Sequence, residues 1–488
     1  MVHFRLDRSN ETALYQQICA RIVSLIEEGT LTAGERLPAT RALAETLGIH
    51  RSTVVRAYEE VRALGYLESR AGSYTTVRLR ARSLTRRAPA SPSEALIDWP
   101  TAANSAVFAL ETRPERRPAD PRPGEPKIDF ERLAADPALA PSDELRRCIK
   151  TVLRRLRGAA FDYTEAAGWR PLREVIARRM RAHGVSVEVD EVVITAGAQQ
   201  ALDLVMRLLC RPGDEVVLEA PSYGMLHALL RLHGLVPIEI PMREDGLDLE
   251  LLGRALQRGP RLVYTMPNFQ NPTGITTSQA HREQLLELCE RYRVPILEDG
   301  FEEDMKYFGQ AVLPIKSMDT HGIVLYVGTF SKVVFPGLRV GWLVAPRRAA
   351  ESISAIQEAM CLAGNTLAQA AAARFCAGGQ FEVYLRRMHR IYRRRMQTLL
   401  HGLDTHLGGN AHWTRPGGGY LLWLTLPSSH GGETTIVSRL EDAGVRVAPG
   451  SRFFAAPPAV PQCRLSISCL DEPQIDEGCR RLGEALRA

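Results

Sequence analysis

The stretch 324-VLYVGTFSKVVFPGLRVGW-342 decides the fold of most of this 488-residue chain. It opens with the apolar run Val324–Val327, which predicts a buried β-strand. A turn with two hydroxyl residues, Thr329 and Ser331, leads directly to Lys332. A lysine in an apolar setting at the end of a strand can act as an amine nucleophile. Because a lone lysine is far more often a solvated surface residue, the rest of the sequence has to decide its role.

Short apolar runs alternate with helical periodicity on both sides of this stretch. This alternation predicts an α/β fold with a mostly parallel sheet and helices on both faces. The expected strands are Val192–Thr195, Glu215–Leu218, Leu262–Thr265, Pro295–Leu297 and Val324–Val327.

Composition indicates a globular chain: 45% of the residues are hydrophobic and 24% are charged. The length alone favours about three domains. There is no apolar run of 18 residues or more and no signal-like N-terminus, so neither a membrane span nor secretion is expected. The nine cysteines include no CxxC pair, so we expect reduced thiols in the cytoplasm, without a zinc site or disulfide framework.

Charge is concentrated near the N-terminus. Residues 36–87 hold eleven arginines and four acidic residues, a net charge of +7, whereas the whole chain has a net charge of +6. This distribution is typical of a surface that binds a polyanion, although a solvated arginine-rich surface explains it equally well. Residues 81–125 contain seven prolines and seven arginines, which predicts an extended linker.

Three helices and a hairpin are expected before this linker. One apolar face runs from Leu14 to Ile26, a second helix ends at Gly48, and a third begins near Ser52 and stops at Gly65. Two short helices joined by a tight glycine turn form a helix-turn-helix pattern, and 65-GYLESRAGSYTTV-77 reads as a β-hairpin wing.

In such a module, the start of the last helix enters the major groove of DNA. The expected contacts with bases and phosphates come from the side chains of Arg41, Arg51, Ser52, Thr53 and Arg56, with Gly72 at the wing tip. Helical periodicity alone would equally suit a protein-interaction module; the tight turn, wing and arginines favour double-stranded DNA. Residues 13–77 resemble the winged helix-turn-helix of the GntR family, with one departure at Tyr74, where that family usually has a second glycine.

Three further motifs surround the lysine in the expected sheet. In 195-TAGAQQALD-203 a strand runs into a helix N-terminus, which suits a phosphate group. Asn271 opens the turn NPTG, and Asp299 ends a strand in ILEDG, at the sheet edge where open α/β folds bind ligands. Together with Lys332 these are the groups that pyridoxal 5′-phosphate requires: a lysine for the Schiff base, an acid for the ring nitrogen and a phosphate cradle.

Residues 128–486 resemble fold-type I aminotransferases, through YTEAAGWRPLR, EAPSYG, NFQNPTG, ILEDG, GTFSK, PGLRVGW and CRLSIS. The resemblance implies a Schiff base on Lys332, with Asp299 at the ring nitrogen and Asn271 at the phenolic oxygen. It implies a substrate carboxylate on Arg464. The implied phosphate and ring contacts are Gly197, Ala198, Gln199, Tyr223, Thr329, Ser331 and Arg339, with Tyr163 reaching the cofactor of a neighbouring subunit.

The chain as a whole resembles the MocR subfamily of GntR-type regulators: a winged helix-turn-helix in residues 1–80, a linker in 81–125 and an aminotransferase-like domain in 126–488. This implies a transcriptional regulator, dimeric and possibly domain-swapped, that senses an amino compound by aldimine formation. Phe301 stands where most such chains have a tyrosine, which argues against efficient transamination, and Met225 stands where the γ-aminobutyrate-responding member has an arginine. The alternatives are a working aminotransferase with an accessory DNA-binding module and a DNA-binding protein with a vestigial body that binds no cofactor.

Overall fold

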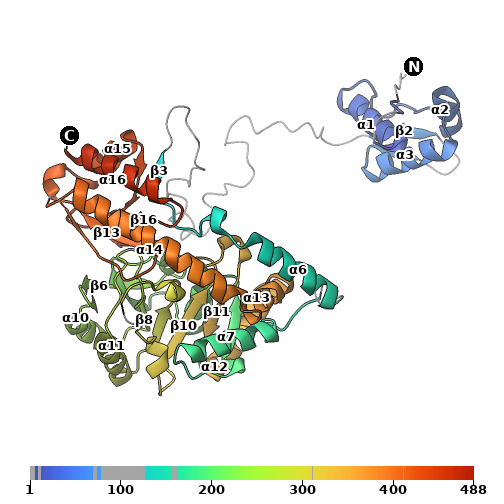
Figure 1. Ribbon diagram of the computed structural model, residues 1–488. Coiled ribbons are helices and arrows are strands. Elements are labelled where there is room, and N and C mark those ends of the chain that lie inside the picture. Colours follow the sequence, from blue (N-terminus) through green and yellow to red (C-terminus); the bar gives the residue numbers. More distant parts are fainter. Residues whose placement is uncertain are drawn as a thin grey trace. The chain divides into compact units, whose positions relative to one another are not determined.

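The computed structural model describes residues 6–8, 12–69, 74–78, 127–156, 158, 162–309, 312–409 and 411–487. The chain divides into two compact units, residues 1–102 and 103–488 (Figure 1). The linker expected at 81–125 and Gly72 lie outside the described residues.

The described part of the first unit contains three helices and a two-stranded wing. Its helices are α1 (Leu14–Glu27), α2 (Thr40–Leu47) and α3 (Arg51–Ala63), followed by the antiparallel strands β1 (Leu67–Ser69) and β2 (Thr75–Val77). Gly48 ends α2 in the left-handed conformation, with φ of 61°, which glycine adopts without the steric cost that a side chain brings. The expected helix-turn-helix and hairpin are thus present.

An eight-stranded sheet forms the centre of the second unit (Figure 1). The pairs β5–β6, β5–β8, β8–β9 and β9–β10 are parallel, whereas β11 runs antiparallel to both of its neighbours. In spatial order the strands are β4 (Val192–Thr195), β11 (Gly341–Val344), β10 (Val324–Thr329), β9 (Ile296–Asp299), β8 (Leu262–Thr265), β5 (Glu215–Ala220), β6 (Val236–Arg243) and β7 (Gly246–Leu247).

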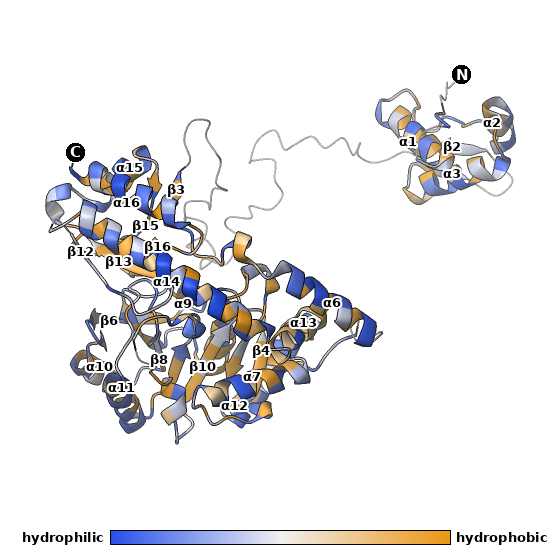
Figure 2. Ribbon diagram, viewed as in Figure 1, coloured by the Kyte–Doolittle hydropathy of each residue, from blue (hydrophilic) through white to orange (hydrophobic). Residues whose placement is uncertain are grey.

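Helices bury this sheet on both faces. Val216 and Leu218 of β5 belong to one hydrophobic cluster, whereas Val217 between them belongs to another, so successive side chains enter two different cores. The strands are coloured as largely hydrophobic in Figure 2. The helices of this region are α6 (Ser142–Leu156), α7 (Arg170–Ala182), α8 (Ala198–Leu209), α9 (Gly224–Leu232), α10 (Leu249–Leu256), α11 (Gln279–Tyr292), α12 (Arg347–Cys361), α13 (Thr366–Ala377) and the long α14 (Gln380–His406).

The C-terminal part of this unit adds a smaller antiparallel sheet. Its strand order is β12 (His412–Trp413), β13 (Leu421–Thr425), β16 (Gln462–Ser466) and β15 (Ala448–Pro449). The helices α15 (Glu433–Asp442) and α16 (Glu472–Arg487) complete it, and β14 (Val445–Arg446) pairs in parallel with β3 (Ile128–Asp129). No helix within the described ranges is long and apolar enough to cross a membrane.

The expected strands Val192–Thr195 and Leu262–Thr265 are confirmed at both ends, whereas the boundaries of β5, β9 and β10 differ from expectation by one to two residues. β9 begins at Ile296 rather than Pro295 and includes Asp299, and β10 extends to Thr329. A strand ends where ladder hydrogen bonds end, which apolar composition does not fix. Asp299 and Thr329 therefore terminate neighbouring strands, at the same edge of the sheet.

Candidate functional site

Lys332 lies just beyond β10, in a turn ordered by hydroxyl groups. The amide of Ser331 donates to Thr329 Oγ1 at 3.1 Å, and that hydroxyl lies 3.0 Å from Ser331 Oγ. The Lys332 side chain is half-buried, and its Nζ donates to the backbone carbonyl of Leu133 at 2.9 Å. The lysine therefore faces the interior of the unit, not the solvent that a lone lysine usually reaches.

Asp299 ends the neighbouring strand with one carboxylate oxygen unused. Its Oδ2 accepts a hydrogen bond of 2.8 Å from the hydroxyl of Tyr264, whereas the buried Oδ1 has no hydrogen-bond partner among the described residues. Burial raises the pKa of Asp299 to about 6, while the Tyr264 hydroxyl, the backbone amide of Phe301 and the Lys332 charge act in the opposite direction. An unpaired, buried acceptor of this kind fits a protonated ring nitrogen as its missing donor.

The start of α8 and Arg339 form a cradle suited to an anion. Gly197 precedes the helix with φ of 91°, and no side chain caps the N–H groups of the first turn, which begins at Ala198. A Cβ atom on Gly197 would lie 3.1 Å from Nη2 of Arg339, so a larger residue here would require the guanidinium to shift. Beside them, the Tyr223 hydroxyl donates to Gln199 Oε1 at 3.1 Å.

Arg464 of β16 and Asn271 meet across the unit, although they are 193 positions apart. Arg464 Nη1 donates to Asn271 Oδ1 at 3.1 Å, and Nη2 donates to the backbone carbonyl of Glu131 at 2.7 Å. Its buried Nε has no partner within the described ranges. Burial lowers the pKa of Arg464 to about 10, and the carboxylates of Glu302 and Glu131 oppose that shift, so the side chain stays cationic at neutral pH. A buried cation with a spare donor suits a carboxylate ligand.

Motif reasoning did not identify Tyr264, Glu219 or Glu302. Glu219 is buried and accepts hydrogen bonds from Thr265 Oγ1, the Met266 amide and Gln270 Nε2, so it orders the turn before Asn271. Burial raises the pKa of Glu219 to about 7. Glu219 opens the quoted stretch EAPSYG but was assigned no role there, and the only sequence signal for Tyr264 and Glu302 was a polar side chain inside or beside an apolar strand.

Glu302 is fully buried, three positions after Asp299. Its Oε2 accepts from the Tyr420 amide at 3.2 Å, and its Oε1 has no partner among the residues that the structure describes. Burial raises the pKa of Glu302 to about 8, against the opposing charges of Lys332 and Arg464. Tyr420 also donates its hydroxyl to the backbone carbonyl of Lys332 at 2.9 Å, so Glu302 and Lys332 share this tyrosine as a support.

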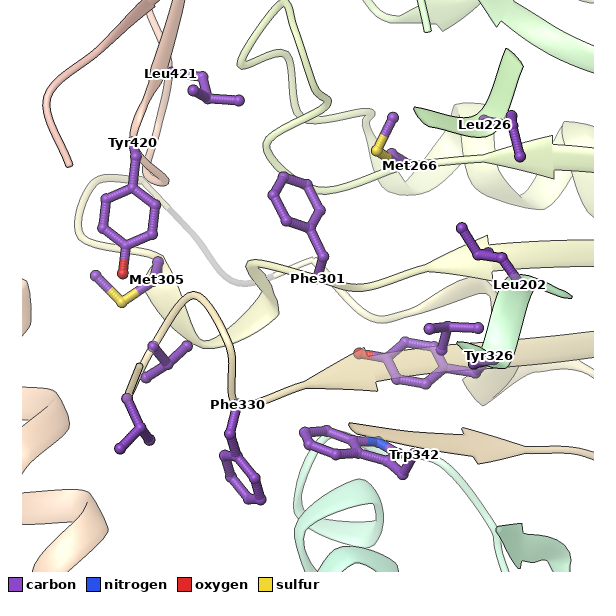
Figure 3. Close-up of a cluster of buried hydrophobic side chains, with 14 of the residues drawn as sticks. Leu202, Leu226, Met266, Phe301, Met305, Tyr326, Phe330, Trp342, Tyr420 and Leu421 are labelled. Atoms are coloured by element: carbon purple, nitrogen blue, oxygen red, sulfur yellow. The ribbon is translucent and has the colours of Figure 1, made fainter. Parts of the chain in front are cut away.

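Phe301, the expected departure from the resemblance, lies in the hydrophobic core. Figure 3 shows its ring within the buried cluster that also contains Met305, Tyr326 and Tyr420. A phenyl ring offers no hydroxyl, so the side chain at this position donates no hydrogen bond; only the backbone amide of Phe301 donates, to the carboxylate of Asp299.

Two other expected residues lie at the surface of the unit. Tyr163 is 77% exposed, and Met225 at the start of α9 is exposed as well. The structure does not bring Tyr163 into its own chain's cluster around Lys332, and contact with a neighbouring subunit remains a prediction.

In the first unit, the residues expected to contact DNA lie on α2 and on the first turns of α3. Arg41, Arg51 and Ser52 are exposed, and Thr53 is half-buried. Arg56 is exposed but engaged, since its guanidinium stacks 4.0 Å above the ring of Tyr15 and donates to the Tyr15 hydroxyl at 3.2 Å.

Neighbouring groups restrain the other two arginines less. Arg41 pairs with Glu45 at 3.3 Å with both side chains largely exposed, and Arg51 Nε lies 3.4 Å from Thr40 Oγ1. Such exposed contacts are weak, so both guanidinium groups are available for a polyanion. On the wing, Arg36 stacks 4.3 Å over Tyr74, which gives this unexpected tyrosine a structural contact.

Comparison with known families matches both units. Residues 137–482 match the model of aminotransferase class I and II, and residues 14–77 match bacterial regulatory proteins of the gntR family. The probable rhizopine catabolism regulatory protein MocR of Rhizobium meliloti is 30% identical, over 99% of this chain and 96% of that protein.

Enzymes are similar to the second unit alone. Aromatic-amino-acid aminotransferase 1 of Thermococcus litoralis is 34% identical, over 72% of this chain and 86% of the enzyme. The crystal structure of LysN, an α-aminoadipate aminotransferase from Thermus thermophilus complexed with N-(5′-phosphopyridoxyl)-L-leucine, superposes with a TM-score of 0.71 and 32% identity, over 80% of this chain and 98% of that one.

Proposed function

This chain belongs to the MocR-type regulators, which join a GntR-type DNA-binding domain to an aminotransferase class I and II domain, and on this premise we propose that it senses an amino compound at Lys332 through bound pyridoxal 5′-phosphate. When bound, the cofactor supplies an aldehyde carbon at which the amines of Lys332 and of an effector exchange. The single observation that carries the proposal is the buried Oδ1 of Asp299, which has no hydrogen-bond partner among the described residues and lies on the strand beside the one that leads to Lys332.

In this proposal each side chain has one task. Asp299 accepts from the ring nitrogen and keeps it protonated, and Asn271 donates to the phenolic oxygen. Arg464 receives the effector's carboxylate. Tyr223 packs on the ring. The phosphate is held by the backbone N–H groups of Gly197, Ala198 and Gln199, where α8 begins, and by the side chains of Thr329, Ser331 and Arg339.

An effector that binds two conformations unequally shifts the balance between them, and DNA affinity changes with it. We infer that the functional unit is a homodimer in the cytoplasm, with the exposed Tyr163 reaching the partner's phosphate. Tyr163→Phe should weaken cofactor binding without changing the mass measured by light scattering. A monomer at all concentrations would remove this part of the proposal.

The test of the cofactor uses its absorbance. Purified protein supplied with pyridoxal phosphate should show an imine band that borohydride bleaches, and Lys332→Ala should lack it. The exposed Lys150→Ala is the matched control and should keep the band. An identical band in Lys332→Ala would place the reacting amine elsewhere.

A working aminotransferase is the second candidate, since the site contains the full set of lysine, acid, asparagine and arginine. Single-turnover conversion of the cofactor to its amine form by an amino acid, followed by sustained turnover with a keto acid, would favour the enzyme. Binding without sustained turnover would favour the sensor, as the missing hydroxyl at Phe301 leads us to expect.

A further inference from the structure

A short segment at the start of the second unit covers both groups that the effector is proposed to use. We call residues Glu131–Leu133 the strap. The backbone carbonyl of Glu131 accepts from Arg464 Nη2 at 2.7 Å, and that of Leu133 accepts from Lys332 Nζ at 2.9 Å. The proposed carboxylate and amine positions are thus both bonded to one three-residue segment.

Side-chain and backbone contacts hold the strap at both ends. Before it, β3 pairs with β14, and the amide of Phe130 donates to the carbonyl of Arg446 at 2.9 Å. Within and after it, Ser468 Oγ donates to the Arg132 carbonyl at 2.9 Å and accepts from the Ala134 amide at 3.2 Å. The strap lies outside the helices and strands, and its Glu131 and Arg132 amides donate to Asp129 Oδ1 at 2.9 and 3.1 Å, so bonds to side chains, not a strand ladder, resist its displacement.

A partly exposed ion pair also stabilises the position of the strap. The Glu131 carboxylate pairs with Arg452, and the two side chains are 37% and 46% exposed. A partly exposed ion pair of this kind contributes little to stability, so it stabilises the observed position of the strap without fixing it there.

Ligand and strap compete for the same donors. A carboxylate that engages Arg464 through both terminal nitrogens would use the edge now facing Asn271 and the Glu131 carbonyl. Lys332 similarly gives up its hydrogen bond to Leu133 when its amine nitrogen is joined to another group. Site occupancy and the strap's position are therefore coupled.

We propose that the strap changes position when the effector site becomes occupied, because an incoming carboxylate displaces the Glu131 carbonyl from Arg464. This inference rests on the proposed function and deepens it. In the sequence, β3 and residues 79–126 stand between the strap and the DNA-binding unit.

Two stable ligands separate the effect of the carboxylate from that of the cofactor ring and phosphate in the full-length protein. Pyridoxamine 5′-phosphate occupies the cofactor position, forms no covalent bond with Lys332 and carries no carboxylate. N-(5′-phosphopyridoxyl)-L-leucine has the same ring and phosphate and adds an α-carboxylate. Hydrogen–deuterium exchange of the peptide that spans 127–136 should be faster with the leucine adduct than with pyridoxamine phosphate.

Two variants break the ion pair between Glu131 and Arg452 with opposite changes of charge. Glu131→Gln and Arg452→Gln should each speed exchange of the strap and each favour the leucine adduct over pyridoxamine phosphate by about 1.5- to 5-fold, the effect of losing one partly exposed ion pair. Glu477→Gln is the matched control, because Glu477 is also 37% exposed and paired with arginine but lies on α16. It should leave both measurements unchanged.

The outcomes divide cleanly. Equal strap exchange with the two ligands, at saturating concentrations of both, would overturn the inference and leave the proposed function intact. A gain of adduct affinity in Glu131→Gln matched by a loss in Arg452→Gln would overturn it too, since simple charge would then explain both. Failure of the protein to bind either ligand would refute the proposed function, and the strap inference with it.

Discussion

Replacing Glu302 with glutamine should make the protein less sensitive to alkaline pH. A fully buried carboxyl whose pKa rises from 4.5 to about 8 binds its proton more tightly in the folded chain than in the unfolded one. Folding stability therefore falls as pH rises from 4.5 through 8, and does not change further above it. Glutamine has nearly the same shape as the protonated acid and has no charge to bury, so the variant should lack this fall.

The magnitude follows from the shift. A rise of 8 − 4.5 = 3.5 pKa units corresponds to a free energy of about 5 kcal/mol, at about 1.36 kcal/mol for each unit. Relaxation of a buried site reduces such penalties. We therefore expect the free energy of unfolding of Glu302→Gln, relative to that of wild type, to increase by about 3–5 kcal/mol when the pH is raised from about 5 to about 8.5. The Tyr420 amide still finds the side-chain oxygen as its acceptor, so the fold should be kept.

Urea unfolding of the full-length protein without cofactor, monitored by tryptophan fluorescence, measures this stability difference at each pH. Four of the five tryptophans lie in residues 103–488, so the signal reports mainly on the unit that contains Glu302. Glu477→Gln is the control: its arginine neighbours lower the pKa of Glu477 to about 2, so it does not titrate in this range. A stability difference between Glu302→Gln and wild type that stayed constant from pH 5 to 8.5 would refute the reasoning.

Three further changes test other parts of the structure. Gly197→Ala should weaken cofactor binding by at least tenfold, measured by absorbance titration, because the new methyl group meets Arg339 at 3.1 Å on a backbone with φ of 91°. Tyr264→Phe should raise the pKa of Asp299 further and cost about 1.5–3 kcal/mol of stability at pH 8 and less at pH 5, since a hydrogen bond to the charged carboxylate is lost; equal urea midpoint shifts at both pH values would contradict this. Arg51→Ala should lower affinity for a duplex selected from a random library by about 1–3 kcal/mol and relax its base preference, and unchanged anisotropy titrations would remove Arg51 from the interface.

Much of the fold could be predicted because its signals are local. Apolar runs located five strands of the large sheet, and Gly48 marked the end of α2. The predicted ends of β9 and β10 were less accurate, because strand ends depend on pairing with neighbouring strands, which the local sequence does not specify.

The site divides in the same way. Motifs identified Lys332, Asp299 and Arg464 as candidates because each stands in a short, recognisable stretch. Tyr264 and Glu302 carry no such stretch, and their importance comes only from the atoms that they face after folding.

The sequence by itself therefore determined the two-unit organisation, the α/β class and the chemical types at the proposed cofactor site. Only the tertiary structure decided that Asp299 has a buried oxygen without a partner among the described residues. It also decided that the Glu131 and Leu133 carbonyls accept from Arg464 and Lys332, which lie 333 and 199 positions away. Helical and strand periodicity follows from bonds between near neighbours in the chain, whereas burial and the pairing of distant donors and acceptors follow from packing of the whole chain.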